Sequence, residues 1–476
     1  MKNSMRAQKR VPRALQLSFA AAALVLTGCA SFSPDGGFAP VQQAAKDRLG
    51  KDVVWARSDQ ARETLQKRVA ELLSNPLSAD DAVQVALLNN RGLQAAFFEL
   101  GISEADRVQA GRLANPGFSF SRLKRGTEVE LERGLHLNLA RLLAMPMVDR
   151  MEQRRFEQTQ QQAISTVLNI ASETRKAYFM TVGADETVRY MRQVQDAAEA
   201  GAELARRMAA VGNWNKLQQA REQSFYADAA LNLARAVQAQ TSAREKLTRL
   251  MGAWGEQAAF KLPDRLPDLP ASALDLPNVE QTAMQQRLDV QAARWSAEQT
   301  AKNLGLTRTT RFINVLELGL LNNRSNEAPT QRGYEIGFEL PLFDWGGARV
   351  AKAEAIYMQA VEQAAQTAID ARSEVREAYL GYRSRYDMAR HFRDEIVPLK
   401  KRISDENLLR YNGMLIGVFE LLADARSQIV SVNGAIESLR DFWVAQADLD
   451  MALIGKPSMA AAAGPAMAAE AGAAAH

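Results

Sequence analysis

The residue types that most often carry out catalysis are few and scattered in this sequence. Its three histidines, His136, His391 and His476, lie far apart and in different predicted segments, so they do not form a metal-binding pattern. The sequence contains no phosphate-binding glycine loop, no GxSxG elbow and no HExxH zinc motif. We therefore predict no catalytic residue, no metal site, no cofactor and no enzymatic activity.

Carboxylates do follow a regular pattern, at alternate positions of two short segments. Glu128 and Glu130 alternate with apolar residues in the first segment, and Glu335 and Glu339 do so in the second. A period of two indicates a β-strand with one apolar and one polar face. The four carboxylates fit the lining of a polar passage better than acid–base catalysis. A half-buried strand in a soluble β-sandwich would have the same pattern, so the alternation alone leaves both interpretations open.

The single cysteine, Cys29, follows a segment with the features of an export signal. Five basic residues and no acid precede an apolar stretch of about a dozen residues, which is too short for a permanent membrane helix. The run from Leu26 to Cys29 resembles the lipobox of bacterial lipoproteins, in which the cysteine sulfur receives a lipid. The sequence therefore predicts a signal peptide over 1–28 and a lipid-anchored, palmitate-bearing Cys29. By the same resemblance, Ala30 favours sorting to the outer membrane.

Composition and charge exclude several classes of protein. The chain has 476 residues, of which 47% are hydrophobic and 24% charged, which is typical of a folded protein with two domains or one large repeated unit. The formal charge of +4 comes from the signal segment, because the remaining chain has 54 basic and 55 acidic residues. A nearly neutral mature chain has no basic surface of the size that phosphate backbones require. We therefore predict no nucleic-acid partner.

The order of the predicted segments indicates a duplicated unit. The organisation is an N-terminal extension of loose structure (29–76), repeat 1 (77–261), a proline-rich linker (262–277), repeat 2 (278–456) and a disordered alanine-rich tail (457–476). Repeat 1 comprises a helix from 77 to about 114 that begins at the Ser78 cap, strands at about 118–140, a long helix at about 147–210 and another helix at about 215–251. Repeat 2 follows the same order, with a helix to about 310, strands at about 311–342, and helices at about 348–411 and 418–454.

Residue matches support the duplication. The run from Ser172 to Tyr178 returns 201 positions later as Ser373 to Tyr379. A helix of about 64 residues is roughly 95 Å long, so it must belong to a bundled assembly. The chain offers only about four strands, whereas a closed membrane barrel needs at least eight and an open sheet cannot expose its edges to lipid. Three chains would supply twelve strands, and the sequence therefore predicts a homotrimer.

Together these features resemble the TolC-like outer-membrane efflux proteins, in their lipoprotein branch. The resemblance covers about residues 77–456. It rests on the duplicated unit, on the strand exit Leu340–Asp344 before Gly346-Gly347, and on Arg410–Gly413 followed by Glu420–Leu422. It implies a mainly α-helical fold with a small β part, in which a trimeric 12-stranded membrane β-barrel, four strands per chain, continues into a long periplasmic α-helical barrel. It also implies an outer-membrane channel that acts as a passive duct and that has a periplasmic adaptor, an inner-membrane pump and outer-membrane lipid as partners.

The resemblance also implies a gate at the periplasmic tip. The glycine breaks predict the tips of the helical hairpins at Gly212, Gly413 and Gly417. The candidate gate residues are Glu420, Asp424, Arg410 and Tyr411. Each of the two acids fits a solvated position on an exposed helix face equally well. The alternative function is a periplasmic lipoprotein adaptor or a structural coiled-coil protein without a pore. Such adaptors usually carry one hairpin and more β structure than this chain.

Overall fold

A computed structural model describes residues 31–113, 115–310, 316–338 and 343–457. The predicted signal peptide, the lipidation site Cys29, the carboxylate Glu339, the strand exit at 340–342 and the tail from residue 458 onward lie outside the described residues. None of the helices in the described ranges carries an apolar stretch that could span a bilayer.

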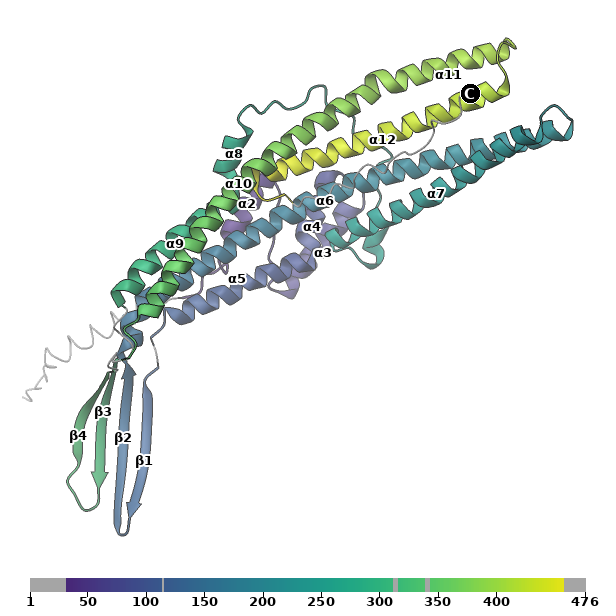
Figure 1. Ribbon diagram of the computed structural model, residues 1–476. Helices are drawn as coiled ribbons and strands as arrows, with labels where there is room; N and C mark the ends of the chain where they lie inside the picture. Colours follow the sequence, from purple (N-terminus) through teal and green to yellow (C-terminus); the bar gives the residue numbers. More distant parts are fainter. Residues whose placement is uncertain (1–30, 114, 311–315, 339–342, 458–476) are drawn as a thin grey trace, which may run out of the picture. The chain divides into compact units, whose positions relative to one another are not determined.

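The described chain is mainly α-helical with a small β part, which confirms the predicted fold class (Figure 1). The first half contains α2 (Ala39–Leu49), α3 (Asp59–Leu73), α4 (Ala79–Asn89), α5 (Arg91–Ala110), β1 (Gly117–Arg125), β2 (Glu128–Asn138), α6 (Leu139–Ala210) and α7 (Lys216–Met251). After the short turn η1 (Gly255–Ala259), the second half contains α8 (Val279–Gln286), α9 (Leu288–Thr310), β3 (Leu316–Ser325), β4 (Gln331–Phe338), α10 (Gly347–His391), the π-turn η2 (Phe392–Ile396), α11 (Val397–Asn412) and α12 (Val418–Ile454).

Two helices that we predicted to be continuous are broken near their starts. The helix predicted from 77 to about 114 is divided at Asn90, and the helix predicted up to about 310 is divided at Arg287. Both residues have extended backbone angles, with ψ of 118° and 126°. The Asn90 side chain accepts a hydrogen bond from Leu93 N and so caps α5, while its amide donates to Leu250 O at 2.8 Å. Tertiary contacts of this kind leave no periodic signal in the sequence.

The two long helices also differ from their predicted bounds. We expected the first to begin after Pro146, but α6 begins at Leu139 and runs through the proline, which removes only its own N–H donor from the ladder. The helix predicted at 348–411 contains a π-turn, where Val397 N donates to Phe392 O. The turn immediately precedes Pro398, whose missing N–H and ring would otherwise disrupt a regular helix at this point.

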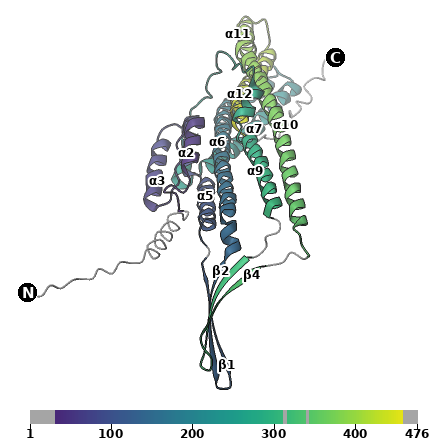
Figure 2. The same ribbon diagram turned by 90° about the vertical axis from the view of Figure 1, so that its left-hand side faces the viewer.

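The chain forms two compact units. Among the described residues, one unit comprises 31–40, 97–161 and 296–360 with the gaps given above, and the other comprises 41–96, 162–295 and 361–457. The first unit contains the sheet, in the order β1-β2-β3-β4 with every neighbouring pair antiparallel. Figure 2 shows the two hairpin turns at the same end of this sheet.

The register of the strands sorts their residues onto two faces, because directly opposite residues project to the same side of a sheet. Leu135 pairs with Phe118 on one side and Leu320 on the other, and Leu320 pairs with Tyr334. We call the face that bears these residues the apolar face. The acidic face bears the intervening residues, namely Glu128, Glu130, Glu132, Glu317 and Glu335, together with His136 and Arg125.

Contacts between the two hairpin turns fix this register. Val129 N donates to Asn326 Oδ1 at 2.7 Å, and Asn326 Nδ2 donates to Thr127 O at 3.0 Å. Thr127 Oγ1 also donates to Glu327 Oε1 at 3.1 Å. The two hairpins are therefore joined at their turns as well as along β2 and β3, although about 200 residues separate them in the chain.

The second unit is a helical bundle with an aromatic core. Phe179 stacks on Trp443 with ring centroids 5.3 Å apart, and Phe442 packs edge-on against Trp443 at 5.1 Å. Tyr178 donates its hydroxyl to Leu77 O at 2.9 Å, and burial raises the pKa of this tyrosine to about 12. These contacts connect α6 and α12 to the segment that precedes α4.

The proline-rich linker is bound to the helices of this unit. It contains no helix or strand between residues 260 and 279, but Leu269 is buried and several helix side chains bond its backbone. Trp443 Nε1 donates to Pro267 O at 2.9 Å, Tyr386 donates to Ala271 O at 2.9 Å, and Leu274 N donates to the Tyr382 hydroxyl at 2.9 Å. The prolines exclude regular structure, whereas the aromatic side chains of α10 and α12 hold the segment in place.

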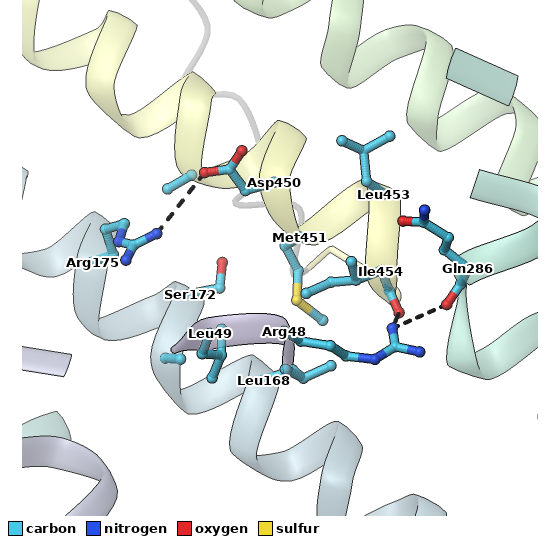
Figure 3. A pocket seen from close by; sticks show the side chains of 12 residues that line it. Arg48, Leu49, Leu168, Ser172, Arg175, Gln286, Asp450, Met451, Leu453 and Ile454 are labelled. Atoms are coloured by element: carbon cyan, nitrogen blue, oxygen red, sulfur yellow. Dashed lines mark hydrogen bonds and ion pairs between the residues drawn. The ribbon is translucent and has the colours of Figure 1, made fainter. Parts of the chain in front are cut away.

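The N-terminal extension is more ordered than its composition indicated, because it contains α2 and α3. Arg48 at the end of α2 lines a cavity of about 290 Å³ and donates to Gln286 O at 3.0 Å and to Ile454 O at 3.4 Å (Figure 3). These are carbonyls at the last turns of α8 and α12, which lack partners within their own helices. Arg48 therefore caps two helix ends, and the polar group that lines this cavity has a structural role.

Candidate functional site

The acidic face of the sheet gathers three of the four carboxylates singled out from the sequence. Glu128, Glu130 and Glu335 share this face, and Glu339 lies outside the described residues. Glu317 also belongs to the acidic face, since it pairs with Asn138 and Gly337. The alternation Leu316-Glu317-Leu318 could have identified it by the same argument that identified the others.

Glycines make room for polar side chains on this face. His136 Nε2 is 2.9 Å from Ser119 Oγ, and both atoms lie above Gly134. A Cβ added at Gly134 would lie 2.7 Å from His136 Nε2 and 2.5 Å from Ser119 Oγ. A Cβ at Gly319 would lie 3.3 Å from His136 Nδ1 and 3.6 Å from Glu335 Oε2. His136 and Glu335 therefore lean toward each other over Gly319. Within the described ranges, no group of three or more His, Cys, Asp or Glu residues is placed to hold a metal ion.

The hairpin between α6 and α7 turns at Gly212, one of the predicted tip residues. Its φ of +77° is a left-handed conformation that favours glycine. Asn213 N donates to Met208 O and Gly212 N donates to Ala209 O, which are the two bonds of a Schellman motif. Asn215 then caps α7 in a capping box with Gln218.

The hairpin between α11 and α12, which carries the predicted tip residues Gly413 and Gly417, uses the same motif. Leu415 N donates to Arg410 O and Met414 N donates to Tyr411 O, so the left-handed position falls on Met414, with φ of 59°. Gly413 and Gly417 lie at this tip but have φ of −80° and −85°, which any residue can adopt. The glycine breaks mark the tip, but the sequence does not indicate which residue there takes the left-handed conformation.

Replacing Met414 with glycine should therefore stabilise this hairpin, by about 0.5–1 kcal/mol. The left-handed conformation costs an L-residue about 1–2 kcal/mol, and the greater freedom of glycine in the unfolded chain offsets part of the gain. Gly413→Ala should change the free energy of unfolding by less than about 0.5 kcal/mol, and Gly212→Ala should lower it by about 1 kcal/mol. Thermal unfolding of the three variants tests this; equal losses for Gly413→Ala and Gly212→Ala would contradict it.

The four candidate gate residues lie in this second hairpin. Arg410 and Tyr411 are in the last turn of α11, where Arg410 Nε is 3.7 Å from Glu406 Oε1. Glu420 is exposed in the first turn of α12. Asp424 is half-buried one turn later, and its Oδ2 is buried without a hydrogen-bond partner in the described part of the chain. The unpartnered oxygen distinguishes Asp424 from a carboxylate that is fully solvated on an exposed helix face.

An ion pair that the sequence analysis missed connects the two hairpins. Arg426 of α12 donates from Nη2 to Glu222 Oε1 of α7 at 2.6 Å. The Glu222 side chain is only 2% exposed, and the Arg426 guanidinium lies 4.4 Å from the centroid of the Phe225 ring. Gly201 of α6 faces the same cluster, since an added Cβ would lie 3.8 Å from Glu222 Oε2. Three helices therefore meet around one buried carboxylate.

Little in the sequence marked this pair. Glu222 follows Arg221 and so resembles part of an exposed charged run. The run Leu217-x-x-Ala220-Arg221 matches Leu422-x-x-Ala425-Arg426 in the second repeat, yet Arg221 is exposed whereas Arg426 turns toward Glu222. The rotation of a long helix about its axis determines which of these positions faces inward. The residue pattern of an alanine-rich helix does not reveal this rotation.

The fold, with its helical hairpins and four-stranded antiparallel sheet, is shared with solved structures of outer-membrane proteins. The fold is similar to the Campylobacter jejuni CmeC outer membrane channel, with a TM-score of 0.63 and 18% identity over 82% of this chain and 85% of that one. It is also similar to the outer membrane protein VceC of Vibrio cholerae, with a TM-score of 0.65 and 16% identity over 84% and 99% of the two chains.

Sequence comparison points in the same direction. The family model for outer membrane efflux proteins matches residues 279–400. The cobalt-zinc-cadmium resistance protein CzcC of Cupriavidus metallidurans is 26% identical over 291 residues, which cover 57% of this chain and 64% of that relative. The predicted resemblance to outer-membrane efflux proteins is confirmed.

Proposed function

We propose that this chain is the outer-membrane channel of a tripartite efflux system, and that it acts as a passive duct for solutes delivered by an inner-membrane pump through a periplasmic adaptor. The observation that carries the proposal is the register-defined separation of the sheet into an apolar and an acidic face. A strand wall of this kind divides lipid from water. A polar lumen then lowers the free-energy cost of moving a solute past the hydrocarbon layer, while the pump supplies the energy.

The open edges of the sheet support a homotrimer. Within the described residues, β1 and β4 have no strand partner on their outer sides, so their backbone groups would be unsatisfied in lipid. Three copies of the four-stranded sheet supply twelve strands and can close by pairing β4 of one copy with β1 of the next. The strands have 8 to 11 residues, close to the roughly 9–11 residues needed to cross a bilayer at a tilt.

The acidic face would then line the lumen. Glu128, Glu130 and Glu335, with Glu317, would favour cations modestly, because three copies place their carboxylates around one passage. The hairpin ends would form the periplasmic entrance, with Glu420, Asp424, Arg410 and Tyr411 as candidate gate residues. Exposed apolar side chains at both tips, such as Val211 at 70% and Met414 at 93%, suit an adaptor that docks there.

The lipid anchor at Cys29 is part of the same proposal. An acylated N-terminus and a closed barrel would hold the chain in the outer membrane, with its helices in the periplasm. The alternative of an adaptor without a pore leaves the apolar face uncovered: Phe118, Tyr334 and Ile336 are 69%, 74% and 55% exposed. A water-soluble protein rarely exposes an apolar surface of this extent, so the channel is favoured.

The test is the mass of the detergent-purified mature protein together with its single-channel conductance in a planar bilayer. We expect a trimer with a small, cation-preferring conductance that rises when Glu420 and Asp424 are both replaced by Ala. Glu245→Ala, on an exposed position of α7, is the matched control and should leave the conductance unchanged. A monomer that produces no conductance would overturn the proposal and favour the adaptor.

A further inference from the structure

The apolar face of the sheet carries a band of positive charge next to the hairpin turns. Leu137, Leu318 and Ile336 occupy one row toward the helices, and Phe118, Leu135, Leu320 and Tyr334 occupy the next row toward the hairpin turns. Closer to the hairpin turns, charged side chains appear on this face. The remaining rows hold five exposed cations, which we call the cationic band: Arg122, Lys124, Arg133, Arg324 and Arg332.

No acid of the described sheet shares this face. All five glutamates of strands β1 to β4 lie on the acidic face, where the only Lys or Arg is Arg125. None of the five side chains of the band forms an ion pair or hydrogen bond in the described part of the chain. Copies of the same chain present the same acid-free face, so the strands of a trimeric barrel do not neutralise the band. An anionic partner outside the barrel wall would do so.

The position of the band indicates where that charge lies. An Arg or Lys on a lipid-facing strand costs about 2–4 kcal/mol at the bilayer midplane and about 0–1 kcal/mol near the interfaces. We therefore expect five such residues on one face to lie at the interface between the bilayer and water. The helices continue from the opposite end of the strands, so the turns and the band face the exterior in the proposed channel.

We propose that the cationic band binds the phosphate groups of the outer-leaflet lipid, and that it fixes the depth and orientation of the channel in the outer membrane. The inference rests on the proposed function, because only a barrel with its apolar face outward brings the band to lipid. Four of the five cations are arginines, whose planar guanidinium groups bind phosphate oxygens in pairs. Phosphorylated glycolipid of the lipid A type has the required chemistry, with anionic groups directly above an acyl layer.

The experiment measures the binding of diphosphoryl lipid A, in mixed micelles, to the purified full-length protein. The band variant is Arg324→Gln with Arg332→Gln, and the matched control is Arg125→Gln, an exposed arginine on the opposite face. We expect affinity to fall about fivefold for each charge removed from the band and to stay unchanged in the control. Arg324→Lys with Arg332→Lys should retain most of the binding, because it preserves the charge.

Two further measurements make the result decisive. Lipid A without phosphates should bind the wild-type protein no more tightly than diphosphoryl lipid A binds the band variant. Equal binding of the two lipids by the wild-type protein would overturn the inference. Trimer mass and conductance of each variant show whether the barrel is intact. A conducting band variant that binds lipid A as tightly as the wild type refutes this inference alone, whereas a wild-type protein that neither trimerises nor conducts refutes the proposed function and the inference with it.

Discussion

Replacing Arg287 with Leu is expected to lower the free energy of unfolding by about 3 kcal/mol or more. Arg287 is fully buried, and its Nη2 lies 2.6 Å from carboxylate oxygens of both Asp289 and Glu374. Its Nη1 also donates to Ala452 O at 3.4 Å. Removing one partner of a buried ion pair typically costs about 3–5 kcal/mol, since the remaining charge loses its compensation. The carboxylates are 26% and 18% exposed, and partial hydration places the loss toward the lower end.

The control for this prediction is Arg294→Leu, an exposed arginine two turns further along α9. This control should change the free energy of unfolding by less than about 0.5 kcal/mol. The loss of unfolding free energy for Arg287→Lys should lie between the losses for the two leucine variants. An ammonium group retains the charge but not the planar geometry that serves two carboxylates and a carbonyl. Chemical unfolding followed by circular dichroism provides the measurement. Equal losses in the two leucine variants would show that the buried cluster contributes nothing specific.

Replacing Arg426 with Ala is expected to loosen the connection between the two hairpins and to raise channel conductance. The change leaves Glu222, which is 2% exposed, without its partner in the bundle. A buried carboxylate without compensation favours conformations in which α7 and α12 separate and water enters. Because the Arg426 side chain is 31% exposed, we expect a loss of about 2 kcal/mol in the free energy of unfolding rather than the full cost of a buried charge.

A double-mutant cycle tests whether the pair itself is responsible. Glu222→Ala, Arg426→Ala and the double variant should show a coupling free energy of at least about 1 kcal/mol. Arg221→Ala changes an exposed arginine next to Glu222 and at the equivalent place in the other repeat, and it should leave conductance and stability unchanged. If the pair does not hold the hairpins together, the conductance of Arg426→Ala will match that of Arg221→Ala.

The strand residues were the most predictable part of the molecule. The alternation around Glu128 and Glu130 identified residues that share a face, because the period of a strand does not depend on what packs against it. The long helices were also predictable in kind, from apolar spacing and the absence of proline. Their interruptions were not: the breaks at Asn90 and Arg287 depend on side chains that bond distant carbonyls.

The buried charges were the least predictable part. Glu222 and Arg287 resemble surface residues in the sequence, and only the packing of distant helices removes them from water. Met414 illustrates the same limit at the level of the backbone. The Schellman bonds of α11 determine which residue becomes left-handed, and this residue is not one of the glycines that mark the tip in the sequence.

The bonds between the two hairpin turns have a consequence for strand pairing. A slip of one residue between β2 and β3 would turn every side chain of one hairpin to the other face, and would mix glutamates into the apolar face and leucines into the acidic face. Such a slipped sheet could still form most of its backbone ladder, so hydrogen bonding along the strands gives little protection against it. Asn326, which bonds both Val129 and Thr127, can form those bonds in only one register. In the barrel proposed above, Asn326 would therefore favour correctly paired hairpins over slipped ones.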